Sequence, residues 1–327
     1  MAPLEYLRPS DEGAAIALAE ADGRACLLAG GTDVVGLLKD GVLAPSRLVD
    51  INALPIAGVE IRDGGLSIGA LTRLSDVADH PAVRGRFPAL AHAVLAAASP
   101  QLRNMATVGG SLLQRTRCGY FRDPVTPCNK RAPGTGCSAI DGEHRLHAIL
   151  GGSDRCIAVH PSDPAVALLA LDAVVRTRGS RKERAIPVDD LYLLPGSTPE
   201  RETLLEHGEL IVAVELPATS FAARSCYLKV RERASFEFAL VSAAVALDVR
   251  GGVIRTARVA LGGVAPRPWR ARAAEAVLRG SRMTEATIAA AASAAVRDAR
   301  PREQNAFKVE LVRRVLTRVL ATAGAGG

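Results

Sequence analysis

Short apolar runs alternate with amphipathic stretches at the start of the chain. Ser10 or Asp11 can cap a helix that extends to about Ala21, and Gly23 can end it. The predicted elements are a strand at 4–7, a helix at 11–21, a strand at 25–28, a helix at 34–39 and a strand at 47–50. This order predicts a small α/β sub-domain over residues 1–57.

The pattern changes near Val59, where two short apolar runs flank Asp63-Gly64-Gly65, a sequence typical of a β-hairpin turn. The elements predicted beyond it are helices at 74–80, 88–98 and 164–171, strands at 173–178 and 210–216, and a charged turn at 179–184. We assign residues 58–218 to a second sub-domain, within which residues 115–160 form an insertion.

Longer apolar runs return in the last third of the chain. They predict antiparallel strands at 227–230, 239–249 and 253–261, then helices at 272–278, 285–297 and 306–322. In the last helix Phe307, Leu311, Val315 and Val319 recur at helical spacing, so this helix packs on a core. We expect a C-terminal α+β domain over residues 222–327.

The composition sets the broad class of protein. The 327 residues are 48% hydrophobic, 23% charged and 3% aromatic, which is typical of a globular chain of two or three domains and excludes disorder. The best apolar run, 239–247, falls well short of the ~18 residues that a membrane helix needs, so we expect no membrane insertion. The first residues include neither a basic nor an apolar stretch, so we expect no signal peptide in this chain.

The net charge of +7 indicates a basic surface that faces an acidic partner. Lysine and arginine are scattered among acidic residues, and aromatic residues for stacking on bases are scarce, so we expect no nucleic acid as a partner. The sequence has no Ser-His-Asp arrangement in a motif context and no paired-carboxylate signature. We therefore expect no hydrolase-type catalytic residue.

Two glycine-rich loops are candidate anion sites. The first, Gly30-Gly31-Thr32-Asp33, lies between a predicted strand and a predicted helix; the second is Thr107-Val108-Gly109-Gly110-Ser111. Glycine N–H groups can converge on a phosphate, although an ordinary tight turn explains either loop alone. Two such loops in different sub-domains favour one dinucleotide bound between them.

Four of the six cysteines, Cys118, Cys128, Cys137 and Cys156, fall in one segment rich in proline and glycine. A loop of this length without secondary structure is usually either held by a cross-link, such as a metal centre or a disulfide, or kept for a function. The spacing C-x9-C-x8-C-x18-C matches neither paired zinc knuckles nor ferredoxins, so an iron–sulfur cluster, zinc, and disulfides or free thiols all stay open. Between residues 115 and 156, seven Lys and Arg against four Asp and Glu favour an anionic cluster.

Two further segments allow two explanations each. Ser162 and Asp163 can cap the helix that follows them, or Asp163 can contact the ribose or the flavin edge of a ligand. Lys229 and Arg231 alternate on one face of a predicted strand. That face is either solvated or turned toward an anionic cofactor.

Taken in order, these segments resemble the FAD-binding subunits of the molybdenum hydroxylases, the xanthine dehydrogenase and aldehyde oxidoreductase family. The resemblance is carried by Leu28-Ala-Gly-Gly-Thr-Asp33, Ile68-Gly-Ala70, Arg103-Asn-Met-Ala-Thr-Val-Gly-Gly-Ser111, Pro161-Ser-Asp163, Glu209-Leu-Ile211 and Tyr227-Leu-Lys229, and it spans nearly the whole chain. It implies an α+β fold in which two sub-domains of the PCMH/VAO-like type hold FAD, followed by a C-terminal antiparallel sheet covered by helices.

The cysteine segment narrows the resemblance. It is similar to the insertion in the FAD subunits of bacterial periplasmic aldehyde oxidoreductases, which carries a [4Fe-4S] cluster. The flavoprotein subunits of 4-hydroxybenzoyl-CoA reductases also have a cluster-bearing insertion, with a different cysteine spacing. By this resemblance, the ligands of a [4Fe-4S] cluster would be Cys118, Cys128, Cys137 and Cys156.

The resemblance also implies which residues contact FAD. The two glycine-rich loops would hold the diphosphate, Asp163 would lie toward the ribityl or flavin side, and Ile211 and Lys229 would lie near the ring. The implied contacts are Leu27, Leu28, Ala29, Gly30, Gly31, Thr32, Asp33, Val34, Thr107, Gly110, Ser111, Asp163, Ile211 and Lys229. The Arg-Arg pair usual after this lysine is replaced here by Arg231-Glu232-Arg233.

The implied function is electron transfer in a heterotrimer. A large molybdenum-cofactor subunit would oxidise an aldehyde, a small [2Fe-2S] subunit would pass the electrons to FAD in this chain, and FAD would reduce an external acceptor. The resemblance implies a periplasmic complex exported with a signal-bearing partner; without that partner we expect the cytoplasm.

Three alternatives remain. One is the flavoprotein subunit of a hydroxybenzoyl-CoA reductase-like enzyme. Another, from a different class, is a zinc- or disulfide-stapled scaffold without redox activity. A VAO-type oxidase acting alone is disfavoured because its cap domain is normally larger than the C-terminal unit predicted here.

Overall fold

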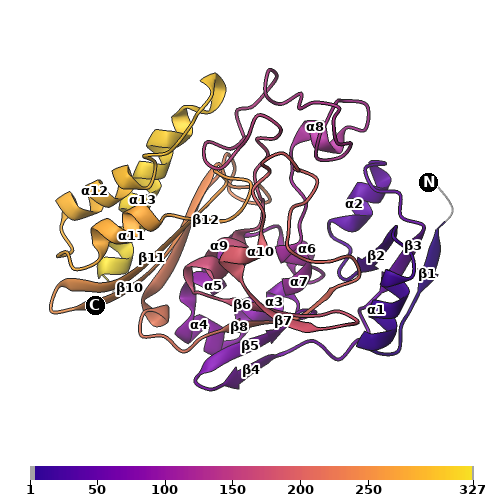
Figure 1. Ribbon diagram of the computed structural model, residues 1–327. Helices are drawn as coiled ribbons and strands as arrows, with labels where there is room; N and C mark the ends of the chain where they lie inside the picture. The colour runs from indigo at the N-terminus through magenta and orange to yellow at the C-terminus, as the bar shows by residue number, and fades with distance from the viewer. Residues whose placement is uncertain (1–3, 326–327) are drawn as a thin grey trace.

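The computed structural model describes residues 4–325, which fold around three β-sheets (Figure 1). The N-terminal unit lies at one end of the molecule, the C-terminal helices lie at the other, and the five-stranded sheet lies between them. Residues 1–3, on which the prediction of no signal peptide depends, and residues 326–327 lie outside the described part. Within residues 4–325, no helix is both long enough and apolar enough to cross a membrane.

The N-terminal unit has the predicted order of elements. Its strands form a parallel sheet in the order β1-β3-β2. The side chain of Asp11 accepts a hydrogen bond from the N–H of Ala14 at 2.8 Å and so caps the first helix. The elements are β1 (Glu5–Leu7), α1 (Glu12–Glu20), β2 (Ala25–Leu28), α2 (Val34–Lys39) and β3 (Arg47–Asp50).

The middle of the chain forms a five-stranded antiparallel sheet in the order β4-β5-β8-β6-β7. Asp63 and Gly64 have φ values of +47° and +75°, which give the predicted tight hairpin. The strands are β4 (Val59–Arg62), β5 (Gly65–Gly69), β6 (Val174–Arg178), β7 (Glu183–Pro187) and β8 (Leu210–Leu216). The predicted charged turn at 179–184 is too long, because β7 begins at Glu183.

Short helices surround this sheet and connect it to its neighbours. Their N-terminal positions are often proline, which needs no hydrogen-bond partner there. They are α3 (Leu74–Asp79), α4 (Pro81–Arg86), α5 (Pro88–Ala96), α6 (Pro100–Arg103), α7 (Val108–Leu112), α8 (Gly119–Arg122), α9 (Asp163–Ala170) and α10 (Val188–Leu191).

The C-terminal sheet has the order β12-β11-β10-β9, and its neighbouring strands are antiparallel. Helices α11–α13 cover one face, while α5 and α9 pack on the other. The elements are β9 (Ser225–Val230), β10 (Val241–Arg250), β11 (Val253–Gly262), β12 (Trp269–Arg270), α11 (Arg272–Leu278), α12 (Glu285–Ala294) and α13 (Phe307–Ala325), with short 3-10 turns at Ala222–Arg224 and Glu303–Asn305.

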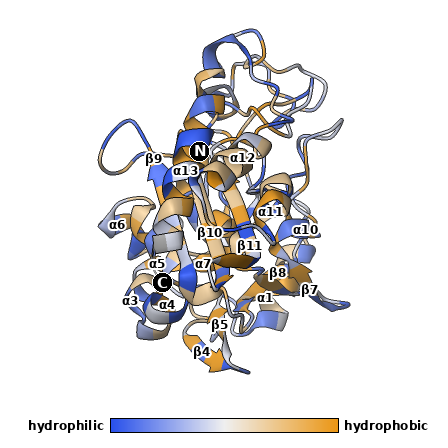
Figure 2. Cartoon of the chain, turned by 90° about the vertical axis from the view of Figure 1, so that its left-hand side faces the viewer, coloured by the Kyte–Doolittle hydropathy of each residue, from blue (hydrophilic) through white to orange (hydrophobic). Residues whose placement is uncertain are grey.

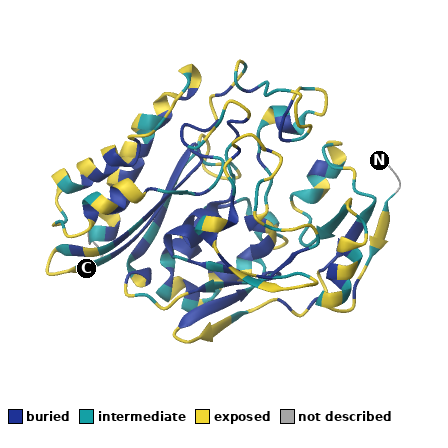
Figure 3. Ribbon diagram, in the orientation of Figure 1, coloured by how far each residue is buried: buried dark blue, intermediate teal, exposed yellow. Residues whose placement is uncertain are grey.

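Strand β10 is buried on both of its faces. Ala243 and Val245 belong to the core beneath α11–α13, whereas Ala244 and Ala246 belong to the core shared with α5 and α9. A strand covered on both faces shows no polar alternation, which explains the unbroken apolar run of the sequence. Hydrophobic residues accordingly concentrate on the central strands in Figure 2, and these strands are dark blue in the burial view of Figure 3.

The segment that carries the clustered cysteines contains only the short helix α8 and is otherwise irregular chain. The fully buried Lys308 donates from Nζ to three backbone carbonyls, those of Leu146, His147 and Gly263, at 2.8, 3.1 and 2.8 Å. Arg131 donates to two carbonyls of α8, at 2.8 and 2.7 Å. Hydrogen bonds from side chains to carbonyls thus hold this segment where no strand ladder does.

Candidate functional site

The two glycine-rich loops line one cavity of about 740 Å³ between the N-terminal unit and the five-stranded sheet. This volume falls within the ~300–1,000 Å³ of typical small-molecule sites. The predicted FAD contacts on its wall are Leu27, Ala29, Gly30, Gly31, Thr32, Asp33, Val34, Thr107, Gly110 and Ile211. The structure therefore brings together both loops and the start of β8.

The glycines of the first loop are needed for two different reasons. A Cβ on Gly30 would stand 1.9 Å from the carbonyl oxygen of Met105, so only glycine lets the two loops meet. Gly31 has a φ of +71°, a left-handed conformation that favours glycine. On the side of Gly30 that a Cβ would occupy, the structure therefore places the backbone that precedes the second loop.

The second loop is the start of α7. Thr107 accepts a hydrogen bond from the N–H of Gly110 on its Oγ1 at 3.2 Å and caps the helix. The N–H of Gly109 donates to the carbonyl of Ala70 at 2.9 Å, and a Cβ on Gly109 would lie 3.1 Å from that of Ala70. The hydroxyl and the glycines therefore fix the helix end against the chain that follows β5.

Four predicted FAD contacts, Leu28, Ser111, Asp163 and Lys229, are not among the residues that line this cavity. Ser111 lies one layer behind the wall. Its Oγ is 3.1 Å from the Oγ of Ser162 and accepts a hydrogen bond at 3.2 Å from Gln114, which does line the cavity. A chain of hydrogen bonds thus connects the cavity wall to the N-terminus of α9.

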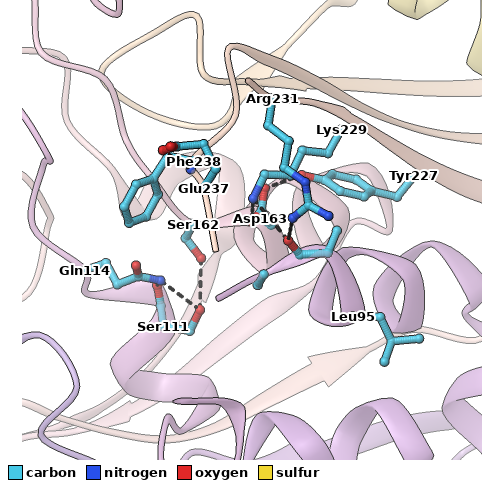
Figure 4. Close-up of polar contacts among 12 residues, drawn as sticks. Leu95, Ser111, Gln114, Ser162, Asp163, Tyr227, Lys229, Arg231, Glu237 and Phe238 are labelled. Carbon is cyan, nitrogen blue, oxygen red and sulfur yellow. Dashed lines mark hydrogen bonds and ion pairs between the residues drawn. The ribbon is translucent and has the colours of Figure 1, made fainter. Parts of the chain in front are cut away.

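Asp163, Tyr227 and Lys229 form a buried network at the start of α9 (Figure 4). Lys229 Nζ donates to Asp163 at 2.7 Å and to the carbonyl of Ala96 at 3.1 Å, and the Tyr227 hydroxyl donates to the other carboxylate oxygen. The side chains of Lys229 and Asp163 are 3% and 5% exposed. Burial raises the pKa of Asp163, and Lys229 opposes that rise.

This network accounts for both segments without a ligand, and contact of Asp163 or Lys229 with FAD stays a prediction. Ser162 caps α9 by accepting from the N–H of Ala165 at 3.3 Å. The strand face that carries Lys229 is not solvated; it turns toward an acidic residue and the end of α5. Asp163 is the partner that makes the burial of this lysine possible.

Methionine in place of Lys229 should lower the free energy of unfolding by about 3–5 kcal/mol, because it leaves the carboxylate of Asp163 buried without its partner. Arg250→Met removes an ion pair of an arginine side chain that is 67% exposed and should cost less than about 1 kcal/mol. Urea unfolding measures both. Adding Asp163→Asn to Lys229→Met should restore part of the loss; equal losses for the two single variants would contradict the network.

Several residues on the cavity wall were missed by the sequence analysis. They are Gln114, Arg115, His160 and Tyr192. The rings of His160 and Tyr192 pack edge to face with centroids 4.6 Å apart, and burial lowers the pKa of His160 to about 4, so this ring is neutral. His160 and Arg115 lie at the two ends of the predicted insertion, but the sequence does not place any of the four residues in the cavity; only the folded chain brings them to the two loops.

The four clustered cysteines lie close enough to influence one another. Burial, with a smaller contribution from the neighbouring thiols of Cys128 and Cys156, raises the pKa of Cys118 to about 11. Burial also raises the pKa of Cys156; Lys130 opposes this rise, and the thiols of Cys137 and Cys128 add to it. Cys128 and Cys137 pair across an isolated antiparallel bridge.

The structure limits the kinds of centre that these cysteines could hold. None of the six cysteines forms a disulfide, so the disulfide staple is not present. Over residues 4–325, no three His, Cys, Asp or Glu side chains stand close enough together to bind a single metal ion. This arrangement supports neither a zinc site nor, by itself, an iron–sulfur cluster.

Comparison with known families divides the chain into two matched parts. Residues 2–219 match the model of the FAD binding domain in molybdopterin dehydrogenase, and residues 226–323 match that of the CO dehydrogenase flavoprotein C-terminal domain. Both glycine-rich loops, the cysteine segment and Ile211 fall in the first part, and Lys229 falls in the second.

Similar proteins include two curated relatives and a solved structure. The chain is 49% identical to the aldehyde oxidoreductase FAD-binding subunit PaoB of Escherichia coli, over 91% of each chain. It is 28% identical to the carbon monoxide dehydrogenase medium chain of Hydrogenophaga pseudoflava, over 91% of this chain and 88% of that one. A solved carbon monoxide dehydrogenase from the same organism superposes with a TM-score of 0.78 at 29% identity, over 99% of this chain and 98% of that one.

Proposed function

Because the chain belongs to the family of FAD-binding subunits of the molybdenum hydroxylases, we propose that it is the flavin subunit of an aldehyde-oxidising complex. It takes electrons from [2Fe-2S] centres of a partner and passes them to an external acceptor. The observation that carries the proposal is the cavity between the two glycine-rich loops, both of which lie in the matched FAD domain. The 49% identity to an aldehyde oxidoreductase subunit supports an aldehyde as the substrate of the complex.

The residues of this chain bind and orient the cofactor. When bound, FAD supplies the exchange between single electrons and electron pairs. Gly31, with its left-handed backbone, lies on the cavity wall, and so does Arg115, whose guanidinium is paired with Glu202. A bound diphosphate would compete with Glu202 for this guanidinium. Lys229 and Asp163 form a buried ion pair behind the cavity wall, and this pair fixes the start of α9. Ser111 is hydrogen-bonded to Ser162 at the same helix end.

We also propose that Cys118, Cys128, Cys137 and Cys156 ligate a [4Fe-4S] cluster, which relays single electrons or pins the segment. The surroundings of Cys156 support this: the N–H of Ala158 donates to its Sγ at 3.5 Å, and the positive charge of the buried Lys130 opposes the rise in the pKa of this thiol that burial causes.

The chain has three proposed structural units and belongs to a proposed complex of three subunits. We propose sub-domains at 1–57 and 58–218 and a C-terminal domain at 222–327; the gap between the matched family models, which end at 219 and begin at 226, supports the last boundary. We propose a heterotrimer with a large molybdenum-cofactor subunit and a small [2Fe-2S] subunit. The name "medium chain" of a relative supports a complex whose subunits have three different sizes. The complex would be periplasmic through an export signal on a partner.

Anaerobic addition of an aldehyde tests this function. It should bleach the flavin absorbance of the purified complex, because electrons arrive from the molybdenum subunit. The isolated chain loaded with FAD should not respond. Bleaching of the isolated chain would indicate an oxidase acting alone, and an unresponsive complex would contradict the assignment to aldehyde oxidation.

A further inference from the structure

Asp33 connects the first glycine-rich loop to the cysteine segment. It stands at the N-cap position of α2, but its side chain makes no capping hydrogen bond there. Its Oδ1 lies 2.7 Å from Arg122 Nη2 and 2.9 Å from Arg117 Nη2, and its Oδ2 accepts from the N–H of Arg115 at 2.8 Å. One carboxylate, 12% exposed, thus gathers three donors from residues 115–122.

An apolar contact reinforces this connection. Leu37 of α2 is buried against Phe121 of α8 and against Cys128, and Cys118 packs at the edge of the same cluster. Leu37 and Phe121 are each 1% exposed. The helix that follows the first glycine-rich loop therefore shares a small apolar cluster with Cys128, against which Cys118 also packs, and α2 and α8 lie near each other in Figure 1.

We propose that Asp33 is a positioning residue that couples the FAD cavity to the cysteine segment. Ordering of residues 27–34 around FAD orders residues 115–122 through this carboxylate, and an ordered segment in turn tightens FAD. Such coupling is reciprocal, because each event changes the other by the same factor. The inference rests on FAD occupying the cavity, as proposed above.

The direction in which Asp33→Asn changes the FAD affinity separates this coupling from simple electrostatics. Asp33 lines the cavity, and its negative charge repels a diphosphate. If charge alone mattered, Asp33→Asn would tighten FAD. If the carboxylate positions the loop by holding Arg117 and Arg122, the same change weakens FAD, because an amide replaces charge-assisted hydrogen bonds with weaker ones.

The experiment compares variants of the full chain, purified with its accompanying subunits, stripped of FAD and titrated with FAD. Quenching of flavin fluorescence gives the dissociation constant, and hydrogen exchange of peptides covering 115–122 reports order in the segment. Asp33→Asn should weaken FAD about tenfold. FAD should slow exchange at 115–122 in the parent protein and not in the variant, a response that a general loss of stability would not remove.

Two further variants complete the design. Arg122 does not line the cavity, so Arg122→Gln should cause the same loss of FAD-dependent protection as Asp33→Asn. Adding Arg122→Gln to Asp33→Asn should change little further. Asp40→Asn is the control, because Asp40 is 45% exposed and 3.6 Å from Arg122. It should leave the FAD affinity unchanged.

The outcomes separate this inference from the proposed function. Unchanged or tighter FAD binding in Asp33→Asn overturns the coupling, as does FAD binding to the parent protein without protection of residues 115–122. Either result leaves the FAD assignment intact. A parent protein that binds no FAD at all overturns the proposed function together with the coupling. If Asp33→Asn does not fold, the exchange measurement on Arg122→Gln decides.

Discussion

Alanine in place of Gly30 should strip the protein of FAD. The new Cβ would stand 1.9 Å from the carbonyl oxygen of Met105 and 2.7 Å from its carbon, and backbone atoms cannot turn away as a flexible side chain can. One of the two loops must move, and the cavity that they share changes shape. Such overpacking costs about 1–3 kcal/mol, which corresponds to roughly a tenfold or greater loss of FAD affinity if the strain is relieved only in the FAD-free form.

The same substitution at Gly85 is the matched control. Gly85 lies in α4, outside the cavity, and a Cβ there meets no atom within 4 Å. Gly85→Ala should retain FAD at the level of the parent protein. Flavin absorbance per chain after gel filtration measures both variants, and equal flavin content would show that the contact between the loops does not shape the FAD site.

Alanine in place of Cys128 should remove most of the iron from the purified protein. Cys128 is 7% exposed and packs on Leu37 and Phe121, so the variant loses a proposed ligand and leaves a void beneath α8. Alanine cannot bind a metal, whereas serine could still supply an oxygen ligand. Iron and acid-labile sulfide per chain are the measurements, and both should fall together.

Cys226→Ala serves as the control for the loss of a thiol. Cys226 is on β9, away from the clustered cysteines, and its Sγ lies 3.4 Å from the carbonyl of Val319. The iron content of Cys226→Ala should equal that of the parent protein. Iron retained in Cys128→Ala would exclude this cysteine as a ligand, and loss of zinc in place of iron would favour the non-redox scaffold.

Most of the longer helices and strands could be predicted from the sequence, because an element that is buried on one or both of its faces leaves a recognisable pattern of apolar residues. The exceptions are elements without such a pattern, among them the short helices α4, α6, α7, α8 and α10, none of which was predicted. Strand β7 is at the edge of its sheet with one buried residue, Ile186, and its charged residues resembled a turn. Strand β12 has only two residues, Trp269 and Arg270, which is too short for any alternation.

The candidate site was predictable only in part. The glycines were enough to mark both loops as candidate sites. The close contact with Met105 that requires glycine at position 30 could not be inferred, because Met105 is distant in sequence. The sequence left the face of Lys229 as either solvated or turned toward a cofactor, because its partner Asp163 is 66 residues away. The order of the cysteine segment depends on Lys308 and Asp33, which contact it from α13 and from the first loop. Long-range polar partners of this kind leave no periodic signal.

Cofactor analysis of the protein purified anaerobically with its partner subunits tests the central claim most directly. Separation of this chain from its partners should give one FAD per chain, together with iron and acid-labile sulfide in the equal amounts that a [4Fe-4S] cube contains, and no zinc. A colourless chain with neither flavin nor iron, or one that carries zinc alone, would contradict the account.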